Sequence, residues 1–354
     1  MDVKIITFHR ALNYGAVLQC FALQKAISNL GVNAYVYDYC NPKISDSYKV
    51  LKLNRNLINN IFQIVSAPIK IKKKNAFNGF INENIRLSGA FTDDDIFITG
   101  SDQVWNWRAS DFDKHYFLDF VSKSKNKNSY AASFGLSEIE EKYILEYKDL
   151  LSDFNNISVR EKTGQQLVSK ICGRESCLLP DPVFLLTRDE WKSLFTEYDK
   201  NKKGYILLYL MAKTQSAINF AKRLSQITGL KVVFIDNYEI RNMFSFKVKR
   251  GIGPKEWLNL FENCEYVVTN SFHGTAFSIL FNKKMFVELL PEGYGVNSRL
   301  IDILQEYGLE DRIIDSKKSG KISDLIEWNS INDKINEKRT KGLNYLKKVI
   351  FECE

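Results

Sequence analysis

Short apolar runs alternate along this chain with longer stretches in which apolar residues recur every three or four positions. The first pattern is typical of buried strands and the second of helices. In the first half, the predicted strands lie at residues 3–8, 33–39, 95–100, 128–135 and 155–161. The predicted helices of this half lie at residues 16–31, 138–151 and 161–171, and the half closes around residues 177–186. A strand, a helix and a second strand therefore open the chain.

The same alternation starts again after Gly204. Strands are predicted at residues 205–211, 231–236, 266–270 and 284–289, and helices at residues 217–228, 254–264, 271–282 and 298–308. The polar, lysine-rich residues 197–203 are the predicted linker. Alternating strands and helices form parallel sheets covered by helices. We therefore predict an α/β fold with two doubly wound parallel-sheet (Rossmann-like) domains facing a cleft, at residues 1–196 and 204–330, followed by a C-terminal helix at 331–354.

One segment interrupts this rhythm, and we interpret residues 45–90 as a basic helical insertion. Between Lys49 and Lys74 there are seven basic residues and no acid, in a chain whose net charge is +8. Apolar residues recur at helical spacing from Leu57 to Val65, and Pro68 is expected to end that helix. Such a basic amphipathic helix can lie on an anionic membrane surface or hold an anionic, lipid-linked substrate. The structural alternative is an ordinary docked helix followed by a solvated lysine turn. It lacks the interleaved aromatic residues of a nucleic-acid site.

Amino-acid composition narrows the kind of protein that this chain can be. The chain has 354 residues, of which 45% are apolar, enough for two domain cores. It has no apolar run of the roughly 20 residues that a membrane span needs, and Met1 leads directly into a strand instead of a signal peptide, so we expect a cytoplasmic protein. The six cysteines are scattered and the histidines are three, without a zinc spacing, so we expect reduced thiols and neither metal nor cofactor.

In open parallel sheets, ligands bind beyond the carboxyl ends of the strands. The turn after the first strand carries Asn13, Tyr14 and Gly15, and the turn after residue 99 carries Gly100, Ser101, Asp102 and Gln103. Another strand delivers Arg160. Each has an ordinary structural alternative, since Gly15 suits a tight turn, Asp102 can cap a loop, and Arg160 can pair with Glu161. Their joint position at strand ends favours a binding site.

The strongest local signal lies where the strand at 266–270 turns into an apolar helix. Asn270 and Ser271 supply capping groups, and His273, Gly274 and Thr275 fall in the first helical turn. The backbone N–H groups there are unpaired and the helix dipole is positive, so the site suits an anion, and a histidine beside that anion can donate a proton. A satisfied structural histidine is the alternative.

Seven stretches together carry a resemblance to a known family. They are NYGAVLQ (13–19), ITGSDQVWN (98–106), YAASFG (130–135), SVRE (158–161), LPDPVFLL (179–186), GPKEWL (253–258) and VTNSFHGTAFSI (268–279), followed by NSRLIDILQEYGL (297–309). As an ordered set, they resemble the polysaccharide pyruvyl transferase family. No GxGxxG follows the first strand and the chain contains no GxxxxGK[ST], which argues against dinucleotide and P-loop enzymes.

The resemblance implies a fold similar to the two-domain GT-B glycosyltransferases. It also implies transfer of a pyruvyl group from phosphoenolpyruvate onto sugar hydroxyls of a surface or capsular polysaccharide precursor, which can be lipid-linked. The functional arginine and histidine would correspond to Arg160 and His273. We expect His273 to donate a proton, Arg160 to hold a carboxylate or phosphate, Asp102 to act as base or hydroxyl ligand, and Asn13 and Asn270 to orient the sugar.

The first turn departs from the family pattern. Many members have a Gly-Asn-x-Gly-Asp type loop there, whereas this chain has LNYGAVLQ, with no acid after Gly15. Since that loop is expected to face the acceptor, both the acceptor and the reaction stay open at this point. Two alternatives remain: a GT-B-type glycosyltransferase that uses a nucleotide sugar, and a non-catalytic scaffold of a polysaccharide-assembly complex.

Overall fold

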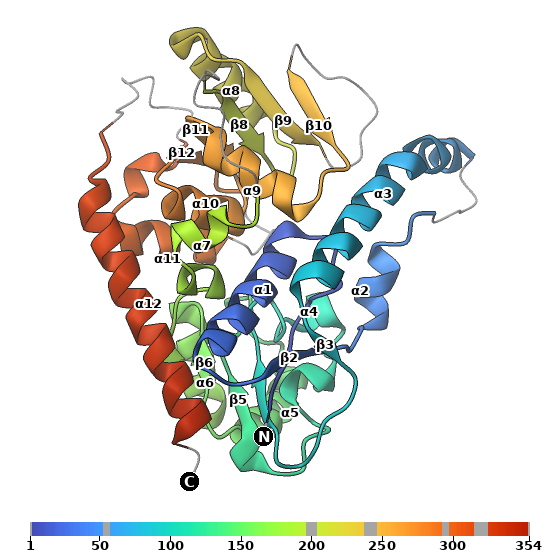
Figure 1. Ribbon diagram of the computed structural model, residues 1–354, viewed down its shortest axis with the longest axis vertical. Helices are drawn as coiled ribbons and strands as arrows, with labels where there is room; N and C mark the ends of the chain where they lie inside the picture. The colour runs from blue at the N-terminus through green and yellow to red at the C-terminus, as the bar shows by residue number, and fades with distance from the viewer. Residues whose placement is uncertain are drawn as a thin grey trace. The chain divides into compact units, whose positions relative to one another are not determined.

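The computed structural model describes residues 2–51, 57–195, 204–236, 246–291, 297–314 and 325–352. The predicted linker at 197–203 lies outside them. The chain divides into two compact units (Figure 1). Unit 1 comprises Met1–Tyr48, Ile81–Leu186 and Lys334–Glu354, and unit 2 comprises Lys49–Phe80 and Thr187–Asp333. This division differs from the expected domains, because most of the basic segment groups with unit 2 and most of the C-terminal helix with unit 1.

Unit 1 is built on a five-stranded parallel sheet of order β3-β2-β1-β4-β5. A parallel pair, β6 and β7, continues it through single bridges from Asn128 to Asn156 and from Ala132 to Val159. The strands are β1 (Val3–Ile6), β2 (Ala34–Tyr37), β3 (Leu87–Ser88), β4 (Ile96–Thr99), β5 (Lys127–Ser129), β6 (Ser158–Val159) and β7 (Cys177–Leu178). The helices are α1 (Tyr14–Asn29), α2 (Pro42–Ser47), α4 (Trp107–Ser110), α5 (Glu141–Ser152) and α6 (Lys162–Cys172), with short 3₁₀ helices η1 (Lys114–Phe117), η2 (Ser124–Asn126) and η3 (Pro182–Leu185).

Unit 2 repeats the same plan, with the parallel strand order β10-β9-β8-β11-β12. Its strands are β8 (Ile206–Tyr209), β9 (Val232–Asp236), β10 (Lys247–Arg250), β11 (Tyr266–Thr269) and β12 (Lys284–Val287). Its helices are α7 (Arg188–Lys192), α8 (Gln215–Thr228), α9 (Pro254–Asn263), α10 (Phe272–Leu280) and α11 (Asn297–Tyr307), with the 3₁₀ helix η4 (Glu310–Arg312). Two doubly wound, Rossmann-like parallel sheets in series confirm the predicted α/β fold class.

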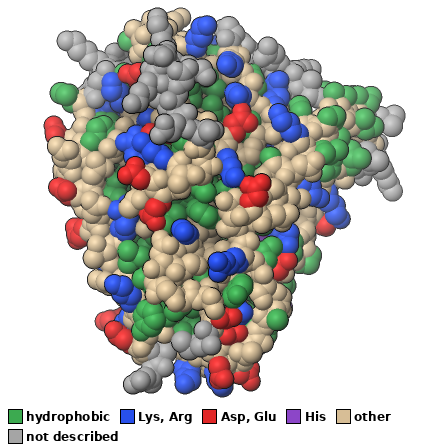
Figure 2. Space-filling model, in the orientation of Figure 1, with side chains coloured by type: hydrophobic (Ala, Val, Ile, Leu, Met, Phe, Trp, Pro, Cys, Tyr) green, Lys and Arg blue, Asp and Glu red, His purple; other side chains and the backbone are tan. Residues whose placement is uncertain are grey.

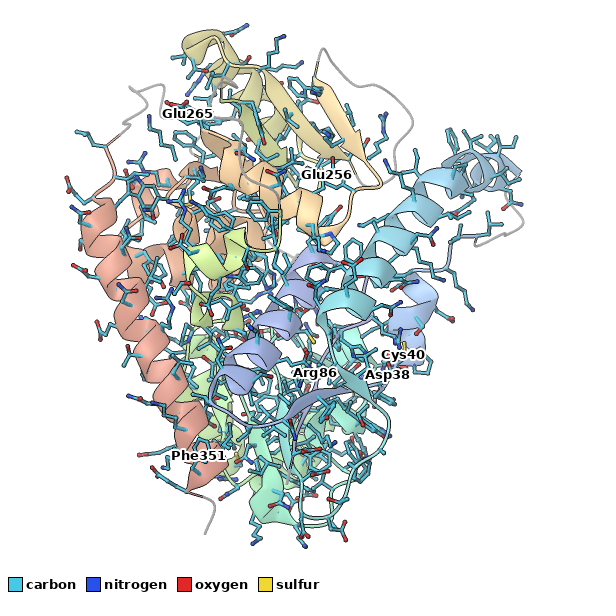
Figure 3. The ribbon with its side chains drawn as sticks, viewed as in Figure 1. Asp38, Cys40, Arg86, Glu256, Glu265 and Phe351 are labelled. Atoms are coloured by element: carbon cyan, nitrogen blue, oxygen red, sulfur yellow. The ribbon has the colours of Figure 1, made fainter. Side chains whose placement is uncertain are left out.

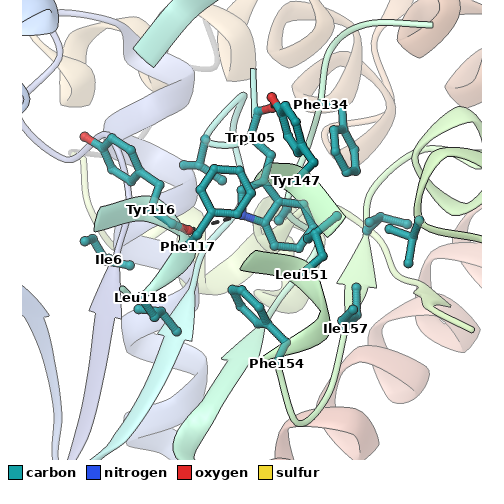
Figure 4. Packing of buried hydrophobic residues seen from close by; sticks show 14 of the residues in the cluster. Ile6, Trp105, Tyr116, Phe117, Leu118, Phe134, Tyr147, Leu151, Phe154 and Ile157 are labelled. Atoms are coloured by element: carbon teal, nitrogen blue, oxygen red, sulfur yellow. Dashed lines mark hydrogen bonds between the residues drawn. The ribbon is translucent and has the colours of Figure 1, made fainter. Parts of the chain in front are cut away.

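The core of unit 1 is unusually aromatic (Figure 4). Trp105 is fully buried, and its ring stacks on Phe117 with ring centroids 5.8 Å apart. Its Nε1 donates to the carbonyl of Tyr116 at 3.1 Å, and the Tyr147 hydroxyl donates to the carbonyl of Trp105 at 2.6 Å. These bonds satisfy the polar atoms of buried aromatic side chains, and they fix the loop that follows β4.

Two long helices contribute to both units: α3 (Leu57–Asn84) and α12 (Trp328–Phe351). The prediction that Pro68 ends the first of them was wrong, because the helix continues through Pro68. A proline cannot donate to the carbonyl four residues earlier, here that of Ile64, but Ile64 and Pro68 are both exposed, so water can satisfy that carbonyl. The predicted lysine turn is therefore helical. Among the described residues, no helix is long and apolar enough to cross a bilayer.

Within α3, Lys73 is 2% exposed, and its ammonium lies 5.4 Å from the centre of the Phe77 ring. Burial lowers the pKa of Lys73 to about 7. An unfolded lysine titrates near pH 10.5, so between these values the unfolded chain binds more protons, and the contribution of Lys73 to stability rises with pH.

We expect Lys73→Met to raise the melting temperature at pH 7 by several degrees, and this gain to shrink toward pH 10. Calorimetry at both pH values measures these melting temperatures, and Lys74→Met, at the exposed neighbouring position, is the control. An equal gain in melting temperature at pH 7 and pH 10 would contradict the prediction.

Candidate functional site

Polar side chains follow several parallel strands of unit 1 at the same sheet edge, and four residues from three strand ends, Ser101, Arg160, Glu161 and Asp181, form one buried network. Arg160 follows β6, and its Nη1 donates to Oδ2 of Asp181 at 2.7 Å. Ser101, after β4, donates from Oγ to the same Oδ2 at 3.1 Å. The Nε atom of Arg160 lies 3.7 Å from Oε2 of Glu161. Ser101 and Arg160, predicted as site residues from separate motifs, are therefore in contact.

The charges of this network are shielded from solvent. The side chain of Arg160 is 2% exposed and that of Asp181 is 0% exposed. Burial by itself lowers the pKa of Arg160, but the negative charges of Asp181, Glu161 and Asp102 outweigh it and raise that pKa. The second carboxylate, Glu161, accepts from the backbone N–H groups of Phe134 at 3.0 Å and Gly135 at 3.2 Å. Arg160 is thus held as a cation between two carboxylates of its own chain.

Asp102 lies next to this network in a strained backbone conformation. Its φ is 81°, a left-handed value that is unfavourable for a residue other than glycine. Its Oδ1 accepts from the N–H of Gln103 at 2.8 Å, and its carbonyl accepts from the N–H of Ser133 at 3.0 Å. The neighbouring Gln103 accepts from the Asn106 side chain at 2.7 Å. Strain held in place by surrounding bonds is common at functional sites, so Asp102 stays a candidate.

The remaining predicted residues of unit 1 have structural contacts. Asn13 caps α1, since its Oδ1 accepts from the N–H of Gly15 at 2.9 Å. Tyr14 and Gly15 are buried within that helix, whose residues from Tyr14 to Gln24 are all buried. Gly100 packs beneath it, where a Cβ atom would lie 3.2 Å from the Leu23 side chain and from Cβ of Thr7. These residues position the sheet edge whether or not they touch a ligand.

Sequence reasoning missed a second cluster at the same edge. Nε2 of His9, after β1, lies 3.0 Å from Oδ1 of Asp38, which follows β2 and is labelled in Figure 3. Arg10 binds both oxygens of Asp38, from Nε at 2.7 Å and Nη2 at 2.6 Å. The hydrogen bond from Arg10 is the main cause that lowers the pKa of Asp38 to about 2. The signal was available for His9, which directly follows the predicted strand at 3–8, whereas Asp38 lies inside the predicted strand at 33–39, which is longer than β2.

In unit 2, the candidate histidine lies where the sequence predicted it. Ser271 caps α10 by accepting from the N–H of Gly274 at 3.2 Å, and Thr275 donates from its hydroxyl to the carbonyl of Ser271 at 3.0 Å. His273 is in the first helical turn and 8% exposed. Gly274 is required by packing, because a Cβ atom there would lie 2.5 Å from Oγ1 of Thr269. The tight strand-to-helix turn thus holds His273 at the carboxyl end of β11.

A buried glutamate, missed by the sequence reasoning, links this turn to its neighbours. Glu288 follows β12 and accepts at Oε2 from the side chains of Thr214 at 2.5 Å and Asn270 at 3.1 Å. Asn270 also accepts from the N–H of Met211 at 2.8 Å and donates to the carbonyl of Ala212 at 2.7 Å. The amide of Asn270 is therefore engaged by the loop after β8, and its contacts set the position of the adjacent Ser271.

A second ion-pair group lies along the same edge of unit 2. Asp236 ends β9 and is 3% exposed. Lys213 lies 3.0 Å from its Oδ1, and Arg250, at the end of β10, lies 3.6 Å from its Oδ2. Polar groups thus end or directly follow β8, β9, β10, β11 and β12, so each unit carries its own polar strand-end cluster. Anion binding by the α10 N-terminus and proton transfer by His273 are chemically compatible with this arrangement.

Comparison with known proteins decides the family. The model of polysaccharide pyruvyl transferases matches residues 13–287, which include every predicted site residue. The chain belongs to the polysaccharide pyruvyl transferase family. It is therefore a transferase, and the resemblance drawn from its motifs is confirmed. No curated protein matches the sequence of this transferase.

Solved structures resemble the transferase over nearly its whole length at low identity. UDP-GlcNAc 2-epimerase of Methanocaldococcus jannaschii is 12% identical with a TM-score of 0.48, covering 97% of this chain and 93% of that one. The Neisseria meningitidis UDP-GlcNAc 2-epimerase is 10% identical, with a TM-score of 0.48 and coverage of 100% and 99%. MurG of Acinetobacter baumannii is 7% identical, with a TM-score of 0.43 and coverage of 99% and 100%. The fold assignment rests on the strand order of the two sheets, and the family assignment on residues 13–287.

Proposed function

We propose that this transferase moves a pyruvyl group from phosphoenolpyruvate onto two hydroxyls of a sugar in a surface or capsular polysaccharide precursor, forming a ketal. The observation that supports the proposal most directly is the position of His273, in the first turn of α10 at the carboxyl end of β11. This turn lies inside the region that matches the family. A buried histidine beside an anion-binding helix terminus suits a reaction that protonates a phosphorylated substrate.

The reaction divides into steps with definite needs. His273 donates a proton to the methylene carbon of phosphoenolpyruvate, and the adjacent carbon becomes cationic. One sugar hydroxyl adds to that carbon and loses its proton, phosphate leaves, and the second hydroxyl closes the ketal with loss of its own proton. The N-terminus of α10 is assigned to an anionic group of the donor, and Asp102 to accepting a hydroxyl proton. The proposed steps need no metal or organic cofactor.

The structure supports a donor-binding role for Arg160 less directly than its motif suggested. We keep it as the residue that holds a carboxylate or phosphate, but its guanidinium already contacts Asp181, Ser101 and Glu161. Asn13, Asn270, Gln103 and the hydroxyl of Ser271 remain proposed sugar or donor contacts. Since Asn13 and Asn270 cap or bridge their own loops, we expect them to act mainly by positioning backbone.

The principal rival reaction is glycosyl transfer from a nucleotide sugar, because the α10 terminus would equally suit a diphosphate. A chain that retained the fold only as a scaffold of an assembly complex would bind neither donor. The lipid linkage of the acceptor and a cytoplasmic location, with contact at the inner face of the cell membrane, are further parts of the proposal.

Thermal melting of the full chain tests the donor. We expect phosphoenolpyruvate to raise the melting temperature in a saturable way, by an amount corresponding to about 2.7 kcal/mol at a hundred times its dissociation constant. Pyruvate and inorganic phosphate added together serve as the control and should give a much smaller shift. Stabilisation by a nucleotide sugar instead, with turnover lost in EDTA and restored by magnesium, would favour the rival. No shift with either donor would favour the scaffold.

A further inference from the structure

The first half of α3 exposes its apolar side chains. Ile58, Ile61, Phe62, Ile64 and Val65 are between 48% and 66% exposed, and they are all the large apolar side chains described between residues 58 and 65. Figure 2 shows hydrophobic side chains gathered over this helix, in the place where Figure 1 draws α3. Contiguous exposed apolar surface of this kind usually marks a contact with another body.

The exposed residues form one face of the helix. At about 100° per residue, Ile58, Ile61, Phe62, Ile64 and Val65 lie within an arc of about 160°. The polar residues of the same two turns occupy the rest of the circumference, and among them Ser66 is buried and Gln63 is half-buried. The helix is therefore amphipathic, with the apolar face toward solvent. A helix that packed its apolar face on its own unit would show the opposite arrangement.

The charges beside this face decide what it can contact. No acid lies between Lys49 and Lys74. Lys72 continues the apolar face toward the C-terminus and is exposed, as is Lys74. The other two lysines of the run are engaged within unit 2, since Lys70 donates to the carbonyl of Val50 at 3.2 Å and Lys73 is buried. Lys72 and Lys74 are thus the two exposed lysines of this run, and of the two only Lys72 lies beside the apolar face, because Lys74 is about 200° around the helix from Lys72.

We propose that the first half of α3 docks on an anionic lipid bilayer, with Ile58, Ile61, Phe62 and Val65 in the interface and Lys72 against the lipid head groups. An amphipathic helix with cations beside its apolar face binds anionic bilayers in this way. A second copy of the chain is disfavoured as the occupant, because pairing two such faces would bring together lysines with no acid in the segment to neutralise them. The proposal is independent of the donor and of the transfer reaction.

Co-sedimentation of the full chain with vesicles tests it. The vesicles contain phosphatidylcholine alone or phosphatidylcholine with phosphatidylglycerol. We expect the unmodified chain to sediment with the anionic vesicles and much less with the neutral ones. The double variant Ile61→Ser with Phe62→Ser should bind at least about tenfold more weakly. The variant Lys72→Ala should lose about fivefold at low salt and less at physiological salt, because salt screens exposed charges.

Matched controls come from other helices. Leu145 in α5 is 74% exposed and Ile227 in α8 is 63% exposed, so the variant Leu145→Ser with Ile227→Ser controls for removing apolar surface. Lys347 and Lys348 are exposed in α12, and their double alanine variant controls for removing charge. Both controls should bind as the unmodified chain does, and circular dichroism verifies that every variant is folded.

Two results would overturn the proposal. The first is binding to anionic vesicles that is absent, or that is equal in the unmodified chain and in both α3 variants. The second is a dimer in light scattering that the Ile61→Ser, Phe62→Ser variant dissociates without a change in vesicle binding, since the face would then belong to a second copy of this chain.

Discussion

The variant His273→Ala is expected to reduce turnover with phosphoenolpyruvate at least about a hundredfold, because it removes the proposed proton donor. His273 lies in the first turn of α10, and the turn is held by the Ser271 cap and by the close approach of Gly274 to Thr269. The imidazole is not among these contacts, so the helix should survive its loss. Steady-state assays with measured melting temperatures check both halves of the prediction.

The matched control is His115→Ala, because His115 lies in η1 of unit 1, in no proposed catalytic role. It should leave turnover within a few fold of the unmodified chain. If His273→Ala also retained near-normal turnover with phosphoenolpyruvate, His273 would have no part in proton transfer. If it lost turnover together with its cooperative melting, the residue would be structural.

For Arg160→Ala, we expect both a loss of turnover of at least about a hundredfold and a loss of about 3–5 kcal/mol in the free energy of unfolding. The expected loss in the free energy of unfolding follows from the buried carboxylates that contact Arg160. Removing the guanidinium leaves the buried carboxylates of Asp181 and Glu161 without their cation, and a buried uncompensated charge is strongly destabilising. Chemical denaturation measures this change in the free energy of unfolding, and a turnover assay measures activity separately.

Two further variants separate a structural role from an anion-holding role. Arg160→Lys keeps the charge but loses the planar fork, so a ligand-holding arginine predicts a raised KM for phosphoenolpyruvate in a chain of nearly normal stability. In the double variant Arg160→Met with Asp181→Asn, part of the stability should return, because neither buried charge of the pair remains. Near-normal kinetics in Arg160→Lys would limit Arg160 to holding the strand ends of unit 1.

The spacing of apolar residues predicted most strands and helices of the fold, because buried strands and amphipathic helices differ in that spacing. β1, β4, β8, β9 and β11 are buried on both faces, and such strands read as continuous apolar runs. The amphipathic helices between them have a different periodicity, so the two element types could be distinguished. Among the elements missed, two strands have weak local signals: β3 has two residues, and β10 is a basic strand, KVKR, with no buried residue.

The sequence by itself determined the order of strands and helices, the turn that places His273 at a strand end, and the family. Those properties depend on periodicity and on motifs, which are local. Tertiary structure alone decided which strand-end residues meet. Arg160 meets Asp181, which is 21 residues away, and Glu288 meets Thr214, which is 74 residues away. Lys73 is buried although its neighbours Lys72 and Lys74 are exposed. Burial is set by what packs against a residue, and in a parallel sheet that neighbour arrives through a long crossover that local sequence does not specify.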